Sequence, residues 1–131
     1  QWEVGSVATD FAHEDIGTTT AKCQRYFNRI AAGDTDVIST VHANTADSYW
    51  YGAVHLPVEM RAIPTESANN DTHFSILNAG ASTACSNISL AGRTSPKTVS
   101  FEITTGARTA GHGGTFMTNN AASTLDLSAE L

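Results

Sequence analysis

Three consecutive aromatic residues, Tyr49, Trp50 and Tyr51, are the sharpest candidates for contact with a ligand. On a strand, consecutive side chains face opposite sides, so Tyr49 and Tyr51 share one face and Trp50 takes the other. We expect one face to join the core and the other to present an aromatic ring at the surface. Sugar recognition uses such a ring, because the C–H face of a pyranose packs on it while amides and carboxylates bind the hydroxyls. A second interpretation stays open, in which all three rings are core or subunit contacts.

Two polar loops contain the amides and carboxylates that a sugar-binding surface needs. Residues 69–71 form one loop, and residues 119–120 form the other. The candidate glycan contacts are therefore Tyr49, Trp50, Tyr51, Asn69, Asn70 and Asp71.

The sequence contains no motif of the common enzyme classes: no Gly-x-Ser-x-Gly, no Gly-rich phosphate loop and no His-Glu-x-x-His. Glycoside hydrolysis needs only two carboxylates at a set separation, and any acidic protein offers such pairs. Here the candidates are Asp47, Glu59, Glu66 and Asp71. His112 lies in a Gly-rich stretch and is interpreted as a solvated loop histidine. No Cys/His spacing resembles a zinc site, so we expect no metal or cofactor. Because the common catalytic motifs are missing as well, we expect that the protein is not an enzyme.

The composition bounds the fold and the partners. A chain of 131 residues is one domain, large enough to bury a single core. Charged residues make up only 15%, while Ser, Thr, Asn, Ala and Gly are abundant, which suits a β-rich protein with many short turns. The net charge of −6 argues against nucleic acid as a partner, because phosphate binding needs clustered Lys and Arg. No run approaches the roughly 20 apolar residues of a membrane span, so we expect no membrane insertion.

Alternation at period 2 predicts a strand over residues 23–30, with Cys23, Arg25, Phe27 and Arg29 on one side. Neither side is cleanly apolar, as expected of a strand that packs on one face and meets a neighbouring surface on the other. Arg and aromatic residues are enriched at interfaces, since they bury apolar area and still carry donors. Arg25, Phe27 and Arg29 are therefore the candidate oligomer interface.

The rest of the chain reads as short strands separated by turns. A helix of at most one or two turns is predicted near residues 12–22, where Asp10 is placed to cap it. A turn is expected at residues 31–34 and a polar loop at residues 66–71. The other strands are predicted at residues 1–8, 37–43, 58–63, 72–77, 84–90, 98–104, 114–118 and 124–131. This spacing predicts an all-β fold, a jelly-roll-like antiparallel β-sandwich.

Three segments in a fixed order carry a resemblance to a known group of proteins. They are WEVGSVATDF (residues 2–11), AKCQRYF (residues 21–27) and LPVEMRAIPT (residues 56–65). Together they resemble the C-terminal region of bacteriophage tail-fibre, adhesin and head-decoration proteins, especially of phages that infect aquatic bacteria and cyanobacteria. The resemblance covers residues 1–65 well and the last seven weakly, and residues 66–124 carry no matching motif. Asn28-Arg29 and Ala12-His13-Glu14 depart from the commonest pattern.

The resemblance implies a domain organisation and a function. Residues 1–11 would end a preceding β-module, and residues 12–131 would form a C-terminal β-sandwich domain. The expected function is that of a virion structural protein, the terminal domain of a homotrimeric fibre that binds host-surface glycan. Two alternatives stay open: a capsid-decoration protein that contacts only other virion proteins, and a cellular carbohydrate-binding module. The resemblance does not choose between a tail and a head location.

The chain contains two cysteines, Cys23 and Cys85, which could form one disulfide. We expect instead two free, buried thiols that behave as small hydrophobic residues. Assembly in a reducing cytoplasm, implied by the resemblance, favours the same state. The opening residues, Gln1 to Val4, alternate like a strand with no Met ahead of them, so we expect the chain to be a piece of a longer polypeptide.

Overall fold

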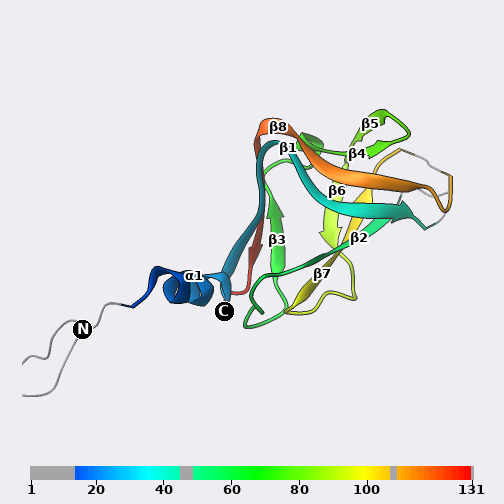
Figure 1. Cartoon of the computed structure of the whole chain (residues 1–131). Coiled ribbons are helices and arrows are strands. Elements are labelled where there is room, and N and C mark those ends of the chain that lie inside the picture. Colours follow the sequence, from blue (N-terminus) through cyan, green and yellow to red (C-terminus); the bar gives the residue numbers. More distant parts are fainter. Residues whose placement is uncertain (1–13, 45–48, 107–108, 131) are drawn as a thin grey trace, which may run out of the picture.

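The computed structural model describes residues 14–44, 49–106 and 109–130. Within these residues the chain forms one α-helix, a short 3-10 helix and eight strands (Figure 1). The helices are α1 (Ile16–Gln24) and η1 (Asp71–His73). The strands are β1 (Phe27–Ala43), β2 (Tyr49–His55), β3 (Thr65–Ala68), β4 (Phe74–Asn78), β5 (Ala81–Ala84), β6 (Asn87–Leu90), β7 (Thr98–Thr104) and β8 (Gly113–Ser128). In the described part no helix is long and apolar enough to cross a membrane.

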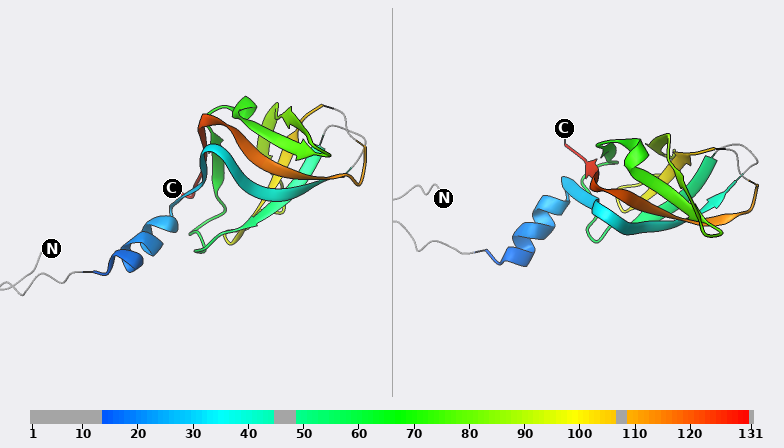
Figure 2. Two further views of the ribbon diagram at one scale, coloured as in Figure 1. Left: turned by 45° about the horizontal axis from the view of Figure 1, so that its top comes forward. Right: turned by 90° about the horizontal axis from the view of Figure 1, so that it is seen from above.

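The strands form one sheet in the order β5-β4-β8-β1-β2-β7-β6, with β3 also paired to β8. Each described strand pair is antiparallel. The sheet curls strongly, so its two halves face each other across one core (Figures 1 and 2). The predicted all-β antiparallel sandwich with one short helix is thus confirmed, and one continuous curled sheet supplies both layers.

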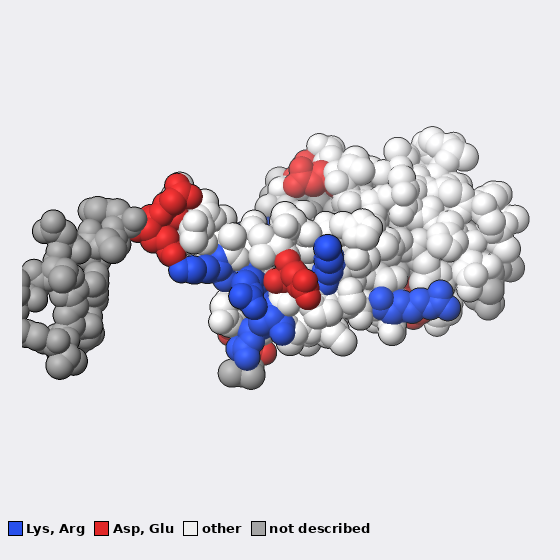
Figure 3. All heavy atoms as spheres, turned by 60° about the horizontal axis from the view of Figure 1, so that its bottom comes forward, with Lys and Arg blue, Asp and Glu red and all other residues white. Residues whose placement is uncertain are grey.

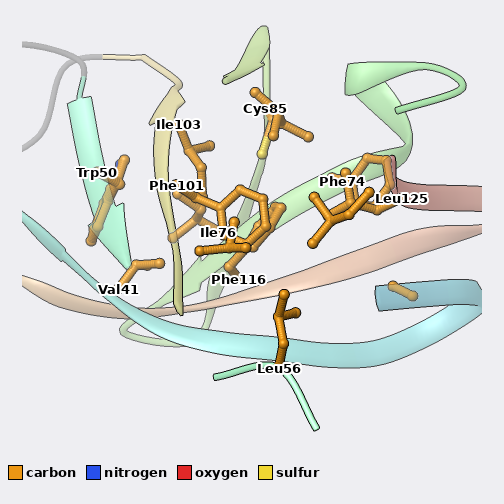
Figure 4. Packing of buried hydrophobic residues seen from close by; sticks show 14 of the residues in the cluster. Val41, Trp50, Leu56, Phe74, Ile76, Cys85, Phe101, Ile103, Phe116 and Leu125 are labelled. Atoms are coloured by element: carbon orange, nitrogen blue, oxygen red, sulfur yellow. The ribbon is translucent and has the colours of Figure 1, made fainter. Parts of the chain in front are cut away.

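The centre of the core is a group of three phenylalanines. Phe116 on β8 lies with its ring centroid 5.9 Å from that of Phe74 on β4 and 5.9 Å from that of Phe101 on β7 (Figure 4). These strands come from the two halves of the sheet, so the three rings hold the halves together. Tilted pairs at this separation add about 0.5–1.5 kcal/mol each beyond the area that they bury.

The longest strand, β1, replaces two strands and a turn that the sequence predicts. The backbone turns at Gly33 and Thr35, whose φ angles are 98° and 64°. The pairing with β8 shifts register several times between Arg29 and Ser39. Such bulges bend a strand without ending its pairing. The expected turn at 31–34 is therefore a bend inside β1, and the strands predicted at 114–118 and 124–131 are likewise parts of β8.

The helix begins later than predicted. The side chain of Asp15, not that of Asp10, is the N-cap and accepts hydrogen bonds from the backbone N–H of Gly17 at 2.9 Å and of Thr18 at 3.2 Å. Cys23 and Gln24 are consequently helical, and the strand predicted over residues 23–30 begins only at Phe27. α1 has no buried residue and stands clear of the sheet in two views (Figure 2).

Several other predictions of local structure need correction. Residues 58–63 are not a strand: the backbone N–H groups of Leu56 and Met60 donate to Lys97 and Pro96, and both side chains are buried, so the segment is an anchored irregular connection. The polar loop expected at 66–71 begins instead as β3, paired with β8. The strand predicted at 84–90 is divided into β5 and β6. β7 matches its prediction in full, whereas residues 1–11, the expected end of a preceding module, lie outside the described residues.

Candidate functional site

The outer face of the sheet carries a groove across three neighbouring strands, β1, β2 and β7. Its cavity volume is about 790 Å³, within the range of small-molecule sites. The groove is lined by Thr40, His42, Asn44, Tyr51, Gly52, Ala53, Ala91, Gly92, Arg93, Ser100 and Glu102. The strand pairing therefore brings together residues that lie about sixty positions apart in the chain.

A row of three polar side chains crosses the groove. His42 on β1 is paired with Tyr51 on β2, and Tyr51 is paired with Glu102 on β7. Side chains directly opposite each other in an antiparallel sheet share a face, so all three point outward. The Tyr51 hydroxyl donates a 2.8 Å hydrogen bond to Glu102 Oε2, and the His42 and Tyr51 ring centroids lie 6.3 Å apart.

The Tyr51–Glu102 hydrogen bond fixes the orientation of the ring and the state of the phenol. Hydrogen bonding to the carboxylate, together with partial burial and the negative charge, raises the pKa of Tyr51. The phenol therefore stays protonated near neutral pH and keeps donating to Glu102. The ring plane is held in place, which reduces the conformational entropy that a ligand must remove on binding.

The far wall of the groove is the turn at residues 91–93. The backbone N–H of Ala91 donates to Ser100 at 2.7 Å and the Thr94 hydroxyl donates to the carbonyl of the same residue at 3.1 Å, so the turn is tied to β7. Arg93 is exposed at its tip, and within the described residues it has no ion-pair partner. The groove thus offers an aromatic ring, a carboxylate and a guanidinium within one concave surface.

Close packing of β1 against β2 beneath the groove depends on Gly52. A Cβ atom at this position would lie 2.6 Å from Val41 Cγ1 and 2.9 Å from the carbonyl oxygen of Thr40. Both distances are well inside van der Waals contact, so any side chain here would push β1 away from β2 and widen the floor of the groove.

The three aromatic residues predicted to contact a ligand lie on opposite faces of β2, as the alternation requires, and one of them is buried. Trp50 is 0% exposed, and its indole N–H donates to Thr105 Oγ1 at 2.9 Å, so it is a core residue and cannot contact a ligand at the surface (Figure 4). Tyr49 is 42% exposed but does not line the groove. Only Tyr51 of the three is a groove residue.

The predicted polar contacts do not join the aromatic ones. The Asn69 side chain donates to the carbonyl of Ala122 and accepts from the N–H of Thr124 at 3.0 Å, while Asn70 caps η1. Thr124 pairs with Ala32, which lies ten residues before His42 on β1, on the other side of the bend in that strand. Asn69 and Asn70 therefore brace β8 and η1, and neither they nor Asp71 line the groove.

The carboxylates considered for glycoside hydrolysis are not gathered in the groove either. Asp47 lies outside the described residues, and Glu59, Glu66 and Asp71 are absent from the groove lining. Glu102 is the one carboxylate among the described lining residues. His112 is exposed in a turn, as predicted. Across the described ranges no three His, Cys, Asp or Glu side chains lie close enough together to hold a metal ion.

Two of the three predicted interface residues contact each other. The Arg29 guanidinium lies 6.0 Å from the Phe27 ring centroid and forms two hydrogen bonds to Asp126, of 2.7 and 2.9 Å. The bond to this carboxylate raises the pKa of Arg29. Arg25 is the C-cap of α1, and its carbonyl accepts from the N–H of Arg61 at 2.9 Å. All three predicted residues are exposed in the single chain.

Both cysteines are free, as predicted, but only one of them is buried. Cys23 is exposed on α1, which corrects the expectation that it is a core residue. Cys85 lies in the core between β5 and β6 (Figure 4), where burial raises the pKa of its thiol to about 12.

Comparison of the chain with protein-family models, with curated proteins and with solved structures found no match. The resemblance to phage structural proteins therefore stays a prediction from the three sequence segments that carry it.

Proposed function

We propose that this chain is the terminal β domain of a homotrimeric phage fibre or adhesin in the virion, and that it binds a host-surface glycan in the groove centred on Tyr51. The observation that supports binding most directly is the orientation of Tyr51. Its ring lines a concave surface of the right size, and Glu102 holds its hydroxyl.

The groove residues provide both kinds of contact that sugar recognition requires, an aromatic ring for the C–H face and polar groups for the hydroxyls. The Tyr51 ring packs against the C–H face of a pyranose. Glu102 has a second carboxylate oxygen that accepts from a sugar hydroxyl, and Arg93 donates to another. Ala53 and Ser100 have short side chains, which leave room for the sugar ring. Binding is reversible and involves no covalent step.

The position of the groove supports a terminal location for the domain. α1 leads into the start of β1 at Phe27, which pairs with Ser128, so both ends of the folded part lie together (Figure 1). The groove lies toward the other end of β1, at His42. A domain attached through α1 would therefore present the groove away from its attachment.

A second function, purely architectural contact with other virion proteins, is favoured by a different observation. α1 carries no buried residue, and Ile16 on it is 81% exposed. A nine-residue helix rich in threonine is marginal by itself in water. Contact with another virion protein would stabilise α1 without any glycan.

A glycan array compared between the unmodified chain and Tyr51→Ala tests the binding proposal. We expect the variant to lose about five- to thirtyfold in affinity, since stacking on one aromatic ring contributes about 1–2 kcal/mol. Tyr49→Ala is the matched control, because Tyr49 is an exposed tyrosine on the same face outside the groove. Absence of glycan binding in the unmodified chain, or equal losses in the two variants, would reject the groove as the binding site.

A further inference from the structure

A surface beside the end of α1 combines arginines with exposed apolar side chains. We call it the basic-aromatic patch and define it as Arg25, Tyr26, Phe27, Arg61 and Ile63. The Arg61 guanidinium lies 5.3 Å from the Tyr26 ring centroid, and the backbone N–H of Arg61 donates to the carbonyl of Arg25, so the segments 25–27 and 61–63 lie side by side. Tyr26, Phe27 and Ile63 are 47%, 45% and 63% exposed. Arg and aromatic residues at this density are typical of the centre of a protein–protein interface.

The patch lies in a part of the surface where positive charge gathers beside α1 (Figure 3). It contains Arg25 and Arg61, two of the seven Lys and Arg residues of the chain, and Lys22 and Arg29 flank its segment 25–27 in the sequence. Lys22 pairs with Glu14, and Arg29 pairs with Asp126. Arg25 and Arg61 have no carboxylate partner within the described ranges, so their charge is available to a second molecule.

A second surface has the opposite charge and a matching apolar residue. We call it the acidic bulge and define it as Asp34, Asp36 and Val37, at the bend of β1. The register shifts on both sides of Asp34 bend β1 here while Asp34 and Val37 stay paired with β8, and all three side chains are exposed. Val37 is 67% exposed, and the two carboxylates have no cationic partner among the described residues.

We propose that the basic-aromatic patch of one copy of this chain binds the acidic bulge of the next copy, head to tail, and that this contact closes the homotrimer. The inference rests on the homotrimer of the proposed function and names the two surfaces that form it. Arg25 and Arg61 meet Asp34 and Asp36, while Phe27 and Ile63 cover Val37.

The occupant is a second copy because the chain itself supplies the complementary surface. An interface that paired two basic-aromatic patches would place arginines against arginines. Asp34 lies seven residues from Phe27 along β1, beyond Gly33 where the strand bends, so one copy presents the two surfaces at separate places. Two different surfaces that fit each other make a heterologous contact, which generates a closed ring when the rotation between copies permits.

Charge reversal and charge exchange test the contact on the whole chain. The variants are Arg25→Glu, Asp34→Arg and the two combined, with Lys97→Glu as a matched control, because Lys97 is an exposed cation outside both surfaces. Size exclusion coupled to light scattering measures the mass, and circular dichroism confirms that each variant folds. We expect a trimer for the unmodified chain and for Lys97→Glu. Each single reversal should raise the dissociation constant by about tenfold or more, and the combined variant should recover most of that loss, since the exchanged charges again attract.

The outcomes separate this inference from the proposed function. If Arg25→Glu dissociates the trimer but Asp34→Arg does not, or if the combined variant fails to recover, the head-to-tail contact is wrong while the trimer stands. A monomeric unmodified chain removes both the contact and the trimer. Glycan binding by Tyr51 is measured on the same proteins and does not depend on either result, because no residue of the two surfaces lines the groove.

Discussion

Adjacent aromatic residues on β2 have opposite environments because a strand alternates its faces. Trp50 is enclosed in the core, whereas Tyr51 lines the groove. The sequence predicts that the two differ. It does not predict which of them is buried, since that depends on Ala43 and Ile103, which lie opposite Trp50 only through the pairing of three strands. His42 and Glu102 were missed for the same reason, because each is an ordinary polar residue until the register places it opposite Tyr51. Arg93 was missed because only the turn at residues 91–93 brings it to the groove.

Replacement of Trp50 measures how much the core depends on this ring. We expect Trp50→Ala to lower the free energy of unfolding by about 3–5 kcal/mol, since a fully buried indole is removed and the Thr105 hydroxyl loses its donor. Chemical denaturation followed by circular dichroism gives the value. Tyr49→Ala should change stability by less than about 1 kcal/mol, and a similar loss in both variants would contradict the separation of the two faces.

Burial of the Cys85 thiol makes stability depend on pH in the alkaline range. Its pKa rises from 9.0 to about 12 in the folded chain, so the folded state holds the proton more tightly than the unfolded state does. This contribution is fully present below the unfolded pKa and is lost as pH rises toward about 12. By about pH 10 the thiol alone should cost about 1.4 kcal/mol of unfolding free energy.

The comparison that isolates this effect is Cys85→Ala, studied by denaturation across the same range. The variant should be less stable at neutral pH, but its stability should fall less steeply above about pH 9, because no thiol titrates on unfolding. Parallel curves for the two proteins would show that Cys85 does not carry the alkaline loss.

At the scale of elements, local sequence signals predict that a helix exists near α1 but not where it ends. Acidic residues ahead of a short polar segment predict a capped helix in this region, and one is present. The boundary was wrong because the alternation from Cys23 onward mimics a strand, whereas Asp15 caps a helix that continues through Gln24. Local pattern alone does not decide between two structures that the same residues can adopt.

Removal of the N-cap should affect α1 and little else. Asp15→Ala leaves the N–H groups of Gly17 and Thr18 without their acceptor, which costs about 1 kcal/mol of helix stability. We expect lower helical ellipticity with an unchanged denaturation midpoint, because α1 buries no residue against the sheet. A large fall in the midpoint would instead show that α1 supports the core.

At the scale of the whole molecule, composition and spacing predict the all-β class but not the path of the sheet. Short strands with turn residues between them are sufficient for the class. The sequence does not predict that β1 pairs with β8, because alternating residues can match in many registers. Arg29 and Asp126, which are bonded across this pair, lie 97 positions apart in the chain. The sequence does not predict the acidic bulge either, because Gly33 and Asp34 have the composition of an ordinary turn.

The central position of β8 has a consequence for how the protein acquires its structure. The ribosome releases β8 after every other described strand, yet β1, β3 and β4 all pair with it. Contacts between such distant parts of a chain raise the contact order and slow folding. During most of synthesis, one edge of β1 therefore lacks its partner β8 and is open to pairing with other strands. A nascent chain that ends before residue 113 lacks the central strand of the sheet, so the sheet cannot close.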